Sequence, residues 1–304
     1  MIGSGQSVLT PHSGPEHSIA TVWWVMFGVS CVGLTFIAVL LLLGWIRRNR
    51  DTLPLGGTER GATRLVVGLG IATPLVLLAA LFVWSDVFVI RTTAAPSPGS
   101  AELEVHVVAH QWFWSIGYGG NRTANELHIP VRTRVNVVGT TADVIHSFWV
   151  PELNRKVDLI PGRTSSVLLY ADRAGTYPGQ CAEFCGQQHA HMQLVVVAQP
   201  RAQYEKWLAG ENQQATHWLP LFAKKGCANC HEIRGTPADA HVGPDLTHVA
   251  SRELLAAGTI PNDRAHLRAW LQDPQKIKPG SRMPNLPLSQ RDLAQLVSYL
   301  ESLK

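Results

Sequence analysis

The residues best suited to bind a metal lie between positions 181 and 192, which read CAEFCGQQHAHM. Together with a histidine at an earlier predicted strand end, they give the set His146, Cys181, Glu183, Cys185, His189 and Met192. Thiolates, imidazoles and a thioether are the donors that select copper. Two thiolates in one tight loop can both bridge a metal pair, which leaves one imidazole for each metal and the thioether as a weaker donor. The pattern predicts a dinuclear copper site.

Other uses of these residues stay open. Cys181 and Cys185 could form a disulfide in an oxidising compartment, or the cluster could hold structural zinc. The histidines and the methionine at suitable positions favour copper over both. His191 directly precedes Met192 on a predicted returning strand, so we expect its side chain to face away from the site. We also expect His110 to be structural.

A second group of reactive residues reads CANCH at positions 227 to 231. In a Cys-x-x-Cys-His motif the two thiols can form thioether bonds with a porphyrin, and the histidine beside them can bind the iron. Cys227 and Cys230 are the predicted attachment points for a haem c, and His231 is the predicted proximal ligand. A Cys-x-x-Cys pair can also bind zinc or exchange disulfides, but the predicted export of this segment favours haem.

The second iron ligand is predicted to be Met283. Of the other methionines, Met192 is assigned to copper, and Met1 and Met26 lie before or within an apolar segment. Ligation by histidine and methionine raises the reduction potential of a haem, which suits a carrier that feeds copper. A role for Met283 in a protein core is the alternative. The remaining histidines of this region are expected at the surface, namely His217, His241, His248 and His266.

Two long apolar segments precede the metal sites. Residues 19–46 and 65–85 contain no charged side chain, and the second segment is expected to continue to about residue 90. At 1.5 Å per residue, each helix is long enough to cross a hydrocarbon core of about 30 Å. These segments explain why only 16% of the 304 residues are charged, against about 25% in a typical soluble chain. Buried core helices or a cleaved signal peptide would fit this length poorly.

Charge predicts how these spans are oriented. The connecting loop, residues 47–64, carries several arginines, whereas the tail over residues 1–18 has no lysine or arginine. Because basic residues favour the cytoplasmic side, we expect both termini and both metal sites on the periplasmic or outer face of a bacterial plasma membrane. The net charge of +4 is too mild to indicate a nucleic-acid surface.

The rest of the chain separates into two predicted domains after a Pro/Ser/Ala linker at residues 91–102. Residues 103–200 contain short alternating segments bounded by Gly, Pro, Asn and Asp, which predict a compact antiparallel β-sandwich or barrel. A helix and linker follow at 201–215, and residues 216–304 have helical patterns joined by Gly/Pro-rich loops. The predicted fold class is a membrane-anchored, multidomain protein with a two-helix transmembrane hairpin, an all-β domain and an all-α domain.

The motifs also carry a family resemblance. Cys181 to Met192 satisfy Cys-x-Glu-x-Cys-x-x-x-His-x-x-Met, and the segments DVIHSFWVP and HQWFW also match, so residues of roughly 15–200 resemble subunit II of the haem–copper cytochrome c oxidases. The resemblance implies a cupredoxin-like fold, with Trp112 as the residue where electrons arrive. It also implies a Glu183 carbonyl on one copper and a Glu183 carboxylate at a magnesium site shared with subunit I. SRMPNLPLS and GPDL make the last domain similar to class I cytochrome c.

This resemblance implies subunit II of a terminal oxidase. Electrons would pass from a cytochrome c or a quinol–cytochrome c reductase to the haem, then to the copper pair and to subunit I, where oxygen is reduced to water with proton translocation. Subunit III is a further expected partner, and no catalytic residue is expected in this chain. Glu59 is the acid nearest to the place where family members often carry a glutamate for proton uptake, but it stands several residues early.

Three other functions compete with this interpretation. The corresponding subunit of a copper-containing nitric oxide reductase could carry the same residues. A membrane-anchored copper-delivery protein needs neither a second span nor a haem, and its thioredoxin-like fold requires an α/β alternation that residues 102–198 lack. A quinol oxidase subunit has no need of the copper ligands.

Overall fold

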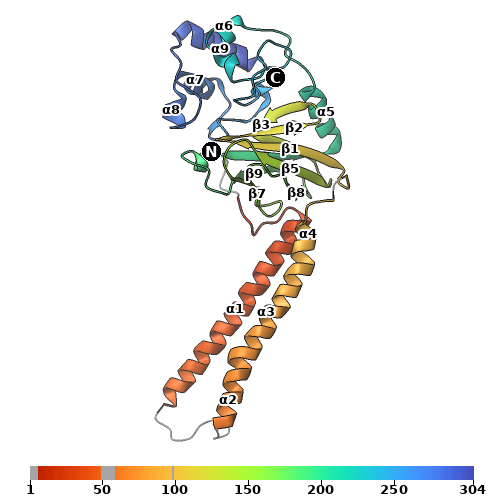
Figure 1. Ribbon diagram of the computed structural model, residues 1–304, viewed down its shortest axis with the longest axis vertical. Coiled ribbons are helices and arrows are strands. Elements are labelled where there is room, and N and C mark those ends of the chain that lie inside the picture. The colour runs from red at the N-terminus through yellow and green to blue at the C-terminus, as the bar shows by residue number, and fades with distance from the viewer. Residues whose placement is uncertain (1–5, 49–58, 98) are drawn as a thin grey trace. The chain divides into compact units, whose positions relative to one another are not determined.

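The computed structural model describes residues 6–48, 59–97 and 99–304 (Figure 1). The chain forms two compact units, one of His17–Thr93 and the other of Ala94–Lys304 with the N-terminal tail up to Glu16. Within the second unit, the backbone of His12 bonds to that of Glu152, with an N–O distance of 3.1 Å. The described part of the tail therefore packs with the domain that follows the helices.

The first unit contains two helices that are long and apolar enough to cross a membrane. One is α1 (Gly14–Ile46), and the other runs from Glu59 to Thr93 as α2 (Glu59–Val67), η1 (Gly68–Ala72), α3 (Thr73–Trp84), η2 (Ser85–Ile90) and α4 (Arg91–Thr93). Both helices are longer than the predicted spans. In each, none of the residues in the most apolar 18-residue stretch is buried inside the protein. Pro74 follows the π-helical turn η1, a type of irregularity often found inside helices. Residues 49–58 of the predicted cytoplasmic loop lie outside the described residues.

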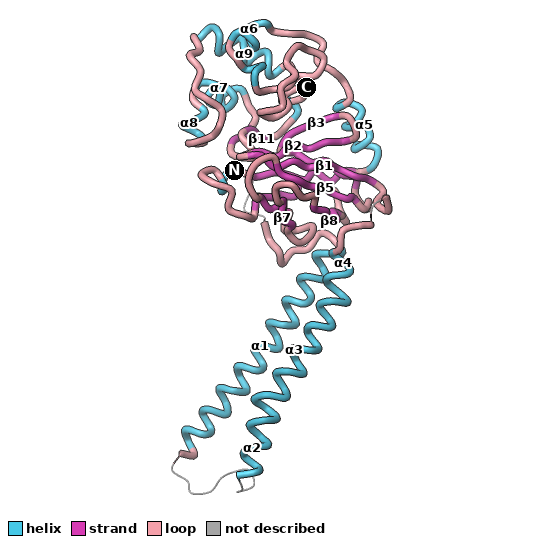
Figure 2. The backbone as a smooth tube through the Cα atoms, in the orientation of Figure 1, coloured by secondary structure: helices cyan, strands magenta, loops and turns pink. Residues whose placement is uncertain are grey.

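Two five-stranded sheets form the β-sandwich (Figure 2). Their orders are β3-β2-β1-β5-β8 and β4-β10-β9-β6-β7. Apolar side chains alternate inward along the strands, as in β1, where Val105, Val107 and Ala109 are buried. The strands are β1 (Leu103–His110), β2 (Phe113–Tyr118), β3 (Asn121–Ala124), β4 (Glu126–Pro130), β5 (Val135–Thr141), β6 (His146–Trp149), β7 (Val157–Leu159), β8 (Ser165–Leu169), β9 (Gly175–Cys181) and β10 (Gln193–Gln199).

The sandwich differs from the predicted antiparallel arrangement at two places. β1 pairs with β5 in parallel, and β10 pairs with β4 in parallel. The chain leaves the first sheet after β3, forms β4 in the second sheet and returns as β5 beside β1. Such a crossing brings strands together in the same direction, and alternation within one strand cannot predict it.

The helix α5 (Arg201–Glu211) belongs to the β-domain core, although the sequence predicted a helix and linker between domains. Tyr204, Trp207 and Leu208 pack into the sandwich core. The His128 ring stacks on Trp207, with ring centroids 3.9 Å apart and planes within 6°. The first domain therefore extends to about residue 211.

The last domain has a separate apolar core, to which α9 contributes Leu293, Leu296, Val297 and Leu300. Its elements are α6 (Pro220–Lys224), η4 (Cys227–Asn229), η5 (Val249–Ser251), β11 (Leu254–Leu255), β12 (Ile260–Pro261), α7 (Arg264–Gln272), α8 (Pro274–Ile277) and α9 (Gln290–Glu301). The short β11–β12 pair is an addition to a domain expected to be all α. It leaves the helical class of the domain unchanged.

Two predictions for this domain are wrong in detail. Residues 218–233 have a helical pattern, which predicts one helix there, but α6 ends at Lys224, because Gly226 is in the left-handed region with φ at 81°. His248, expected at the surface, is only 6% exposed. Its ring nitrogens bond the carbonyls of Gln213 and Lys304 at 3.1 and 2.8 Å, so His248 ties the start of the domain to its last residue.

Candidate metal centres

Strand pairing brings the predicted copper ligands together. His146 begins β6 and Cys181 ends β9, and these two strands are neighbours in the second sheet. The other three donors lie on the connection from β9 to β10. The sulfur of Cys181 lies 3.7 Å from His146 Nδ1 and 3.8 Å from Cys185 Sγ. Cys185 Sγ in turn lies 3.6 Å from His189 Nδ1 and 3.8 Å from Met192 Sδ.

This donor set fits copper. The separation of 3.8 Å between the sulfurs of Cys181 and Cys185 rules out a disulfide in this structure, because a disulfide bond is about 2.05 Å long. Four of the five side chains are buried, and His189 is half-buried. Three of these residues, His146, Cys181 and Cys185, have ligand atoms that all lie within 4.8 Å of one another. Zinc could also bind to these three donors. The thioether of Met192 beside them favours copper.

The two thiols of this site share their protons unequally. The hydrogen bond between the two thiols lowers the pKa of Cys181, and a further bond with His146 acts in the same direction. The same thiol–thiol bond raises the pKa of Cys185. Because thiolates are the metal-binding form, we expect metal binding at these two cysteines to release protons.

Asp143 orients His146 and was not identified from the sequence. Asp143 Oδ1 lies 2.9 Å from His146 Nε2, which leaves Nδ1 facing Cys181. A carboxylate bound to the outer nitrogen of a metal-binding histidine fixes its tautomer and ring orientation. The sequence signal was the position of Asp143 in DVIHSFWVP, three residues before the histidine.

Trp112 and Glu183 lie at the same loop. The indole Nε1 of Trp112 donates a hydrogen bond to the carbonyl of Cys185 at 3.1 Å. Its ring covers Gly186, where a Cβ would come within 3.1 Å of the indole. The Glu183 carbonyl lies 3.2 Å from Cys181 Sγ, and its side chain is exposed. Trp112 is thus one hydrogen bond away from a predicted copper ligand.

His191 and His110, which are not predicted to bind copper, lie outside the donor cluster. His191 is exposed, and its Nδ1 lies 2.8 Å from Gln188 Oε1. His110 stacks on Phe113, with parallel rings whose centroids are 4.5 Å apart.

The CANCH segment holds its histidine in one orientation. His231 Nδ1 lies 2.8 Å from the carbonyl of Pro244, so Nε2 is the nitrogen left for an iron. Gly243 lies against the ring, because a Cβ there would come within 2.8 Å of His231 Cε1. Burial lowers the pKa of His231, which favours the neutral imidazole that binds metals.

The other residues predicted to bind haem are also compatible with a covalent porphyrin. The backbone amides of Cys230 and His231 both bond the carbonyl of Cys227, at 3.2 and 3.1 Å, so one turn carries both thiols and the imidazole. Both cysteines are free and half-buried. Half-buried apolar side chains, including Leu246, Leu271 and Leu288, surround the core of this domain. Met283 is also half-buried, and its carbonyl accepts a hydrogen bond from Gln275 at 2.7 Å.

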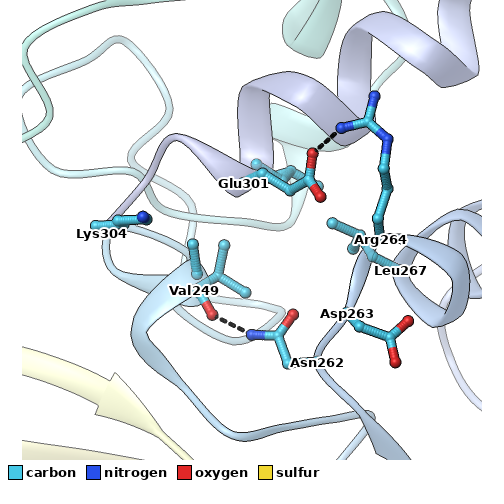
Figure 3. Close-up of a pocket in the computed structure, with 9 residues that line it drawn as sticks. Val249, Asn262, Asp263, Arg264, Leu267, Glu301 and Lys304 are labelled. Atoms are coloured by element: carbon cyan, nitrogen blue, oxygen red, sulfur yellow. Dashed lines mark hydrogen bonds and ion pairs between the residues drawn. The ribbon is translucent and has the colours of Figure 1, made fainter.

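A hollow of about 250 Å³ lies elsewhere on the last domain (Figure 3). Its polar lining is largely bonded within itself, because Arg264 pairs with Glu301 and Asn262 bonds the carbonyl of Val249. It contains none of the predicted copper or haem ligands. We assign it no role in metal binding.

Two family models match the chain. "Cytochrome C oxidase subunit II, periplasmic domain" matches residues 120–199, and "Cytochrome c" matches residues 220–304. The chain belongs to the cytochrome c oxidase subunit II family. The oxidase domain implies copper binding, and the cytochrome c domain implies a haem. The fold is therefore a pair of apolar helices, a cupredoxin-like sandwich and a cytochrome c domain.

Relatives of this subunit II extend the match beyond the sandwich. "Cytochrome c oxidase subunit 2" of Alkalihalophilus pseudofirmus is 37% identical over 220 residues, which cover 69% of this chain and 64% of the relative. The protein of the same name from Bacillus sp. (strain PS3) is 31% identical, with coverages of 66% and 62%. The chain thus aligns with somewhat less than two thirds of the length of these relatives.

A solved structure covers a smaller part of the chain. The periplasmic domain of subunit II of cytochrome oxidase of Bradyrhizobium japonicum is 29% identical and covers 39% of this chain and 96% of that one, with a TM-score of 0.37. The family assignment therefore rests on the sequence matches.

Proposed function

We propose that this chain is the electron-accepting subunit of a terminal cytochrome c oxidase. It receives electrons at a haem c bound by Cys227, Cys230, His231 and Met283, and passes them to a dinuclear copper centre and on to subunit I. Oxygen is reduced to water there, with proton translocation. The observation that carries the proposal is the convergence of five soft donors at 3.6 to 3.8 Å in a subunit II domain that shares one compact unit with a cytochrome c domain.

In this proposal the copper pair is held by His146, Cys181, Cys185, His189 and Met192, with the Glu183 carbonyl as a further donor. When bound, the copper pair and the haem supply reversible one-electron chemistry. The protein's own contribution is to keep the donors in place: Asp143 fixes His146, and Pro244 fixes His231. Fixed ligands reduce the rearrangement that accompanies a change of charge.

Trp112 is the proposed point where electrons reach the copper domain. Its indole is half-buried and bonds the carbonyl of Cys185, so an electron that reaches the ring is one hydrogen bond from a copper ligand. The exposed carboxylate of Glu183 lies on the same loop and is the proposed ligand of a magnesium ion at the boundary with subunit I.

The proposed setting is a bacterial plasma membrane. The two apolar helices span the bilayer, the arginine-rich loop is cytoplasmic, and both metal domains face the periplasmic or outer side. Subunit I and subunit III are the proposed partners in the membrane. A cytochrome c or a quinol–cytochrome c reductase is the proposed donor.

Metal analysis of the purified complex tests the proposal. This chain should carry two copper ions and one covalent haem, and the complex should consume oxygen when reduced cytochrome c is added. One zinc ion in place of copper would contradict the copper assignment. Reduction of nitric oxide, without oxygen uptake, would instead assign the chain to a nitric oxide reductase. A complex with no haem retained on the denatured chain would contradict the cytochrome assignment.

A further inference from the structure

The segment that directly precedes Met283 forms one of the contacts between the cytochrome domain and the copper domain; others include the bond from Arg234 to Asn121. Residues 278–282 read KPGSR, and each end of this segment reaches across to the copper side. The Lys278 amine donates to the carbonyls of Trp112 and His191 at 3.0 and 2.8 Å, and to that of Ala256 in its own domain at 3.1 Å. One side chain therefore joins the Trp112 segment, the copper loop and a cytochrome loop.

Lys278 is buried within this interface and is not exposed to solvent. Its side chain is only 3% exposed. An ammonium group has three donors, and all three are directed at carbonyl oxygens. Burial lowers the pKa of Lys278 to about 7, so removing this amine from water is costly and the three carbonyls offset that cost.

The rest of the segment follows the copper loop closely. Gln188 donates to the carbonyl of Pro279. Gly280 has φ at 79° and lies so close to the Gln187 amide that any Cβ would overlap it. A larger residue here would strain the backbone and displace the end of the Gln187 side chain.

Arg282 connects the segment to a predicted copper ligand. Its guanidinium donates to Gln111 Oε1 at 2.6 Å and lies 3.8 Å from Asp143. Asp143 is the residue that bonds His146, so a chain of polar contacts runs from the residue before Met283 to the copper site.

The neighbouring cytochrome loop makes its own contact. The Gln193 amide, directly after Met192, donates to the carbonyl of Ala257 at 3.1 Å. Ala256 and Ala257 have φ of 52° and 56°, values that non-glycine residues rarely adopt. Such conformations persist where the surrounding contacts hold them. Here the carbonyls of both alanines are bonded across or beside the interface.

We propose that Lys278 is a positioning residue that locks the segment before Met283 onto Trp112 and the copper loop, so that the two metal sites stay at one fixed separation. The inference rests on the proposed function. It replaces the simpler picture, in which a tethered cytochrome domain meets Trp112 by repeated random encounters.

Lys278→Met tests this role, because methionine keeps an unbranched chain and removes the donors. The matched control is Lys276→Met, since Lys276 lies in the same stretch and is exposed. Both variants are prepared in the full chain within the purified complex. Copper and covalent haem are measured first, and both variants should hold them at the level of the unmodified protein.

Hydrogen exchange at the Gln193 amide is the first readout, because its acceptor lies in the other domain. We expect its exchange in Lys278→Met to be faster by about tenfold or more. The control should exchange like the unmodified protein. This measurement reports docking and does not depend on oxidase activity.

Internal electron transfer is the second readout. One electron leaves the ferrous haem, which becomes ferric, and reduces the copper pair, with no bond formed or broken. In the unmodified protein the rate should not change with solvent viscosity. In Lys278→Met it should fall about tenfold and vary with viscosity, because the domains must then meet by diffusion.

Unchanged Gln193 exchange together with a viscosity-independent rate in Lys278→Met would overturn the proposal. If that variant does not accumulate, Arg282→Gln takes its place, because Arg282 is exposed and its loss leaves no buried charge unpaired. Faster Gln193 exchange is then expected, and unchanged exchange would count against the interface. Failure of the proposed function is a separate result, since it would appear as missing copper or haem in the unmodified protein.

Discussion

The copper domain and the cytochrome domain build their metal sites in different ways. In the copper domain, paired strands and one loop bring the sulfur and nitrogen atoms to within 3.6 to 3.8 Å of their neighbours, and four of the five side chains are buried. In the cytochrome domain the ring of His231 is oriented by the Pro244 carbonyl, and His231, Cys227, Cys230 and Met283 are all half-buried. The comparison shows that paired strands gather and bury most of the predicted copper ligands, whereas the predicted haem ligands lie on half-buried turns and loops.

The largest expected effect is at Cys181. Cys181→Ser removes the bridging thiolate from the site, so we expect the mixed-valence copper signal to disappear and oxygen uptake to stop. Haem attachment should be intact, because Cys227 and Cys230 lie in the other domain. Electron paramagnetic resonance and oxygen uptake measure both effects. Cys31→Ser, in the first apolar helix, is the control. Oxygen uptake at the normal rate in Cys181→Ser would contradict the proposed role of the copper site in electron transfer to oxygen.

Loss of Met283 should have a smaller effect, because two thioether bonds and His231 still hold the haem. Met283→Ala should lower the haem potential, within the roughly 0.8 V range that axial ligands control. Electron transfer to copper should slow, and the copper signal should not change. Redox titration of the haem band measures the shift. An unchanged potential and spectrum would show that Met283 is not an iron ligand.

Asp143→Asn tests whether the copper site depends on its outer hydrogen bonds. The amide can still bond His146 but no longer offers a carboxylate, and loss of such a partner typically weakens metal binding by about 10- to 100-fold. Competition with a copper chelator measures this affinity. Asp239→Asn, exposed in the cytochrome domain, is the control. Equal copper retention in both variants would contradict the role given to Asp143.

Ser289→Ala should affect the cytochrome domain alone. Ser289 caps α9 by accepting a hydrogen bond from the Asp292 amide at 3.1 Å. Removing a serine cap typically costs about 1 kcal/mol. Thermal unfolding followed by the haem signal should shift to lower temperature, with an unchanged copper signal. A shift in the copper signal instead would mean that the two cores unfold together.

The smallest expected effect is on acid stability at the same helix end. The ion pair with Lys225 and the bonds from Ser289 lower the pKa of Asp292 from 3.8 to about 2. A lowered folded-state pKa gives stability that is present above pH 3.8 and lost as the pH falls towards 2. The unfolding temperature should therefore fall more over this interval in the unmodified protein than in Asp292→Asn. Parallel acid profiles would contradict the role of this contact.

The same contrast explains what the sequence could predict. The copper donors stand close together in one motif, so their convergence with His146 was expected, and the structure does bring them together. Their metal-binding roles are still predictions. The local pattern does not predict β9, because its sequence, GTYPGQC, contains two glycines and a proline, which disfavour strands outside a sheet that holds them.

Contacts between distant segments account for most other differences. The stack of His128 on Trp207 and the bonds of Lys278 to Trp112 join residues that no local pattern relates. The sequence predicts His248 at the surface because a lone histidine, here between Thr247 and Val249, gives no sign of its distant backbone partners. Periodicity identifies α7 and α9, but it cannot predict which loop each domain presents to the other.

The packing of α5 into the sandwich core also limits how far the cytochrome domain can move. Only the eight residues from Asn212 to Leu219 connect α5 with α6. At about 3.3 Å per residue, a fully extended chain of this length reaches roughly 26 Å. The Ala215 amide bonds the carbonyl of Arg234, which shortens the free length further. A cytochrome domain released from the copper loop would thus stay within this short distance of α5, so its search for Trp112 would cover only a small volume.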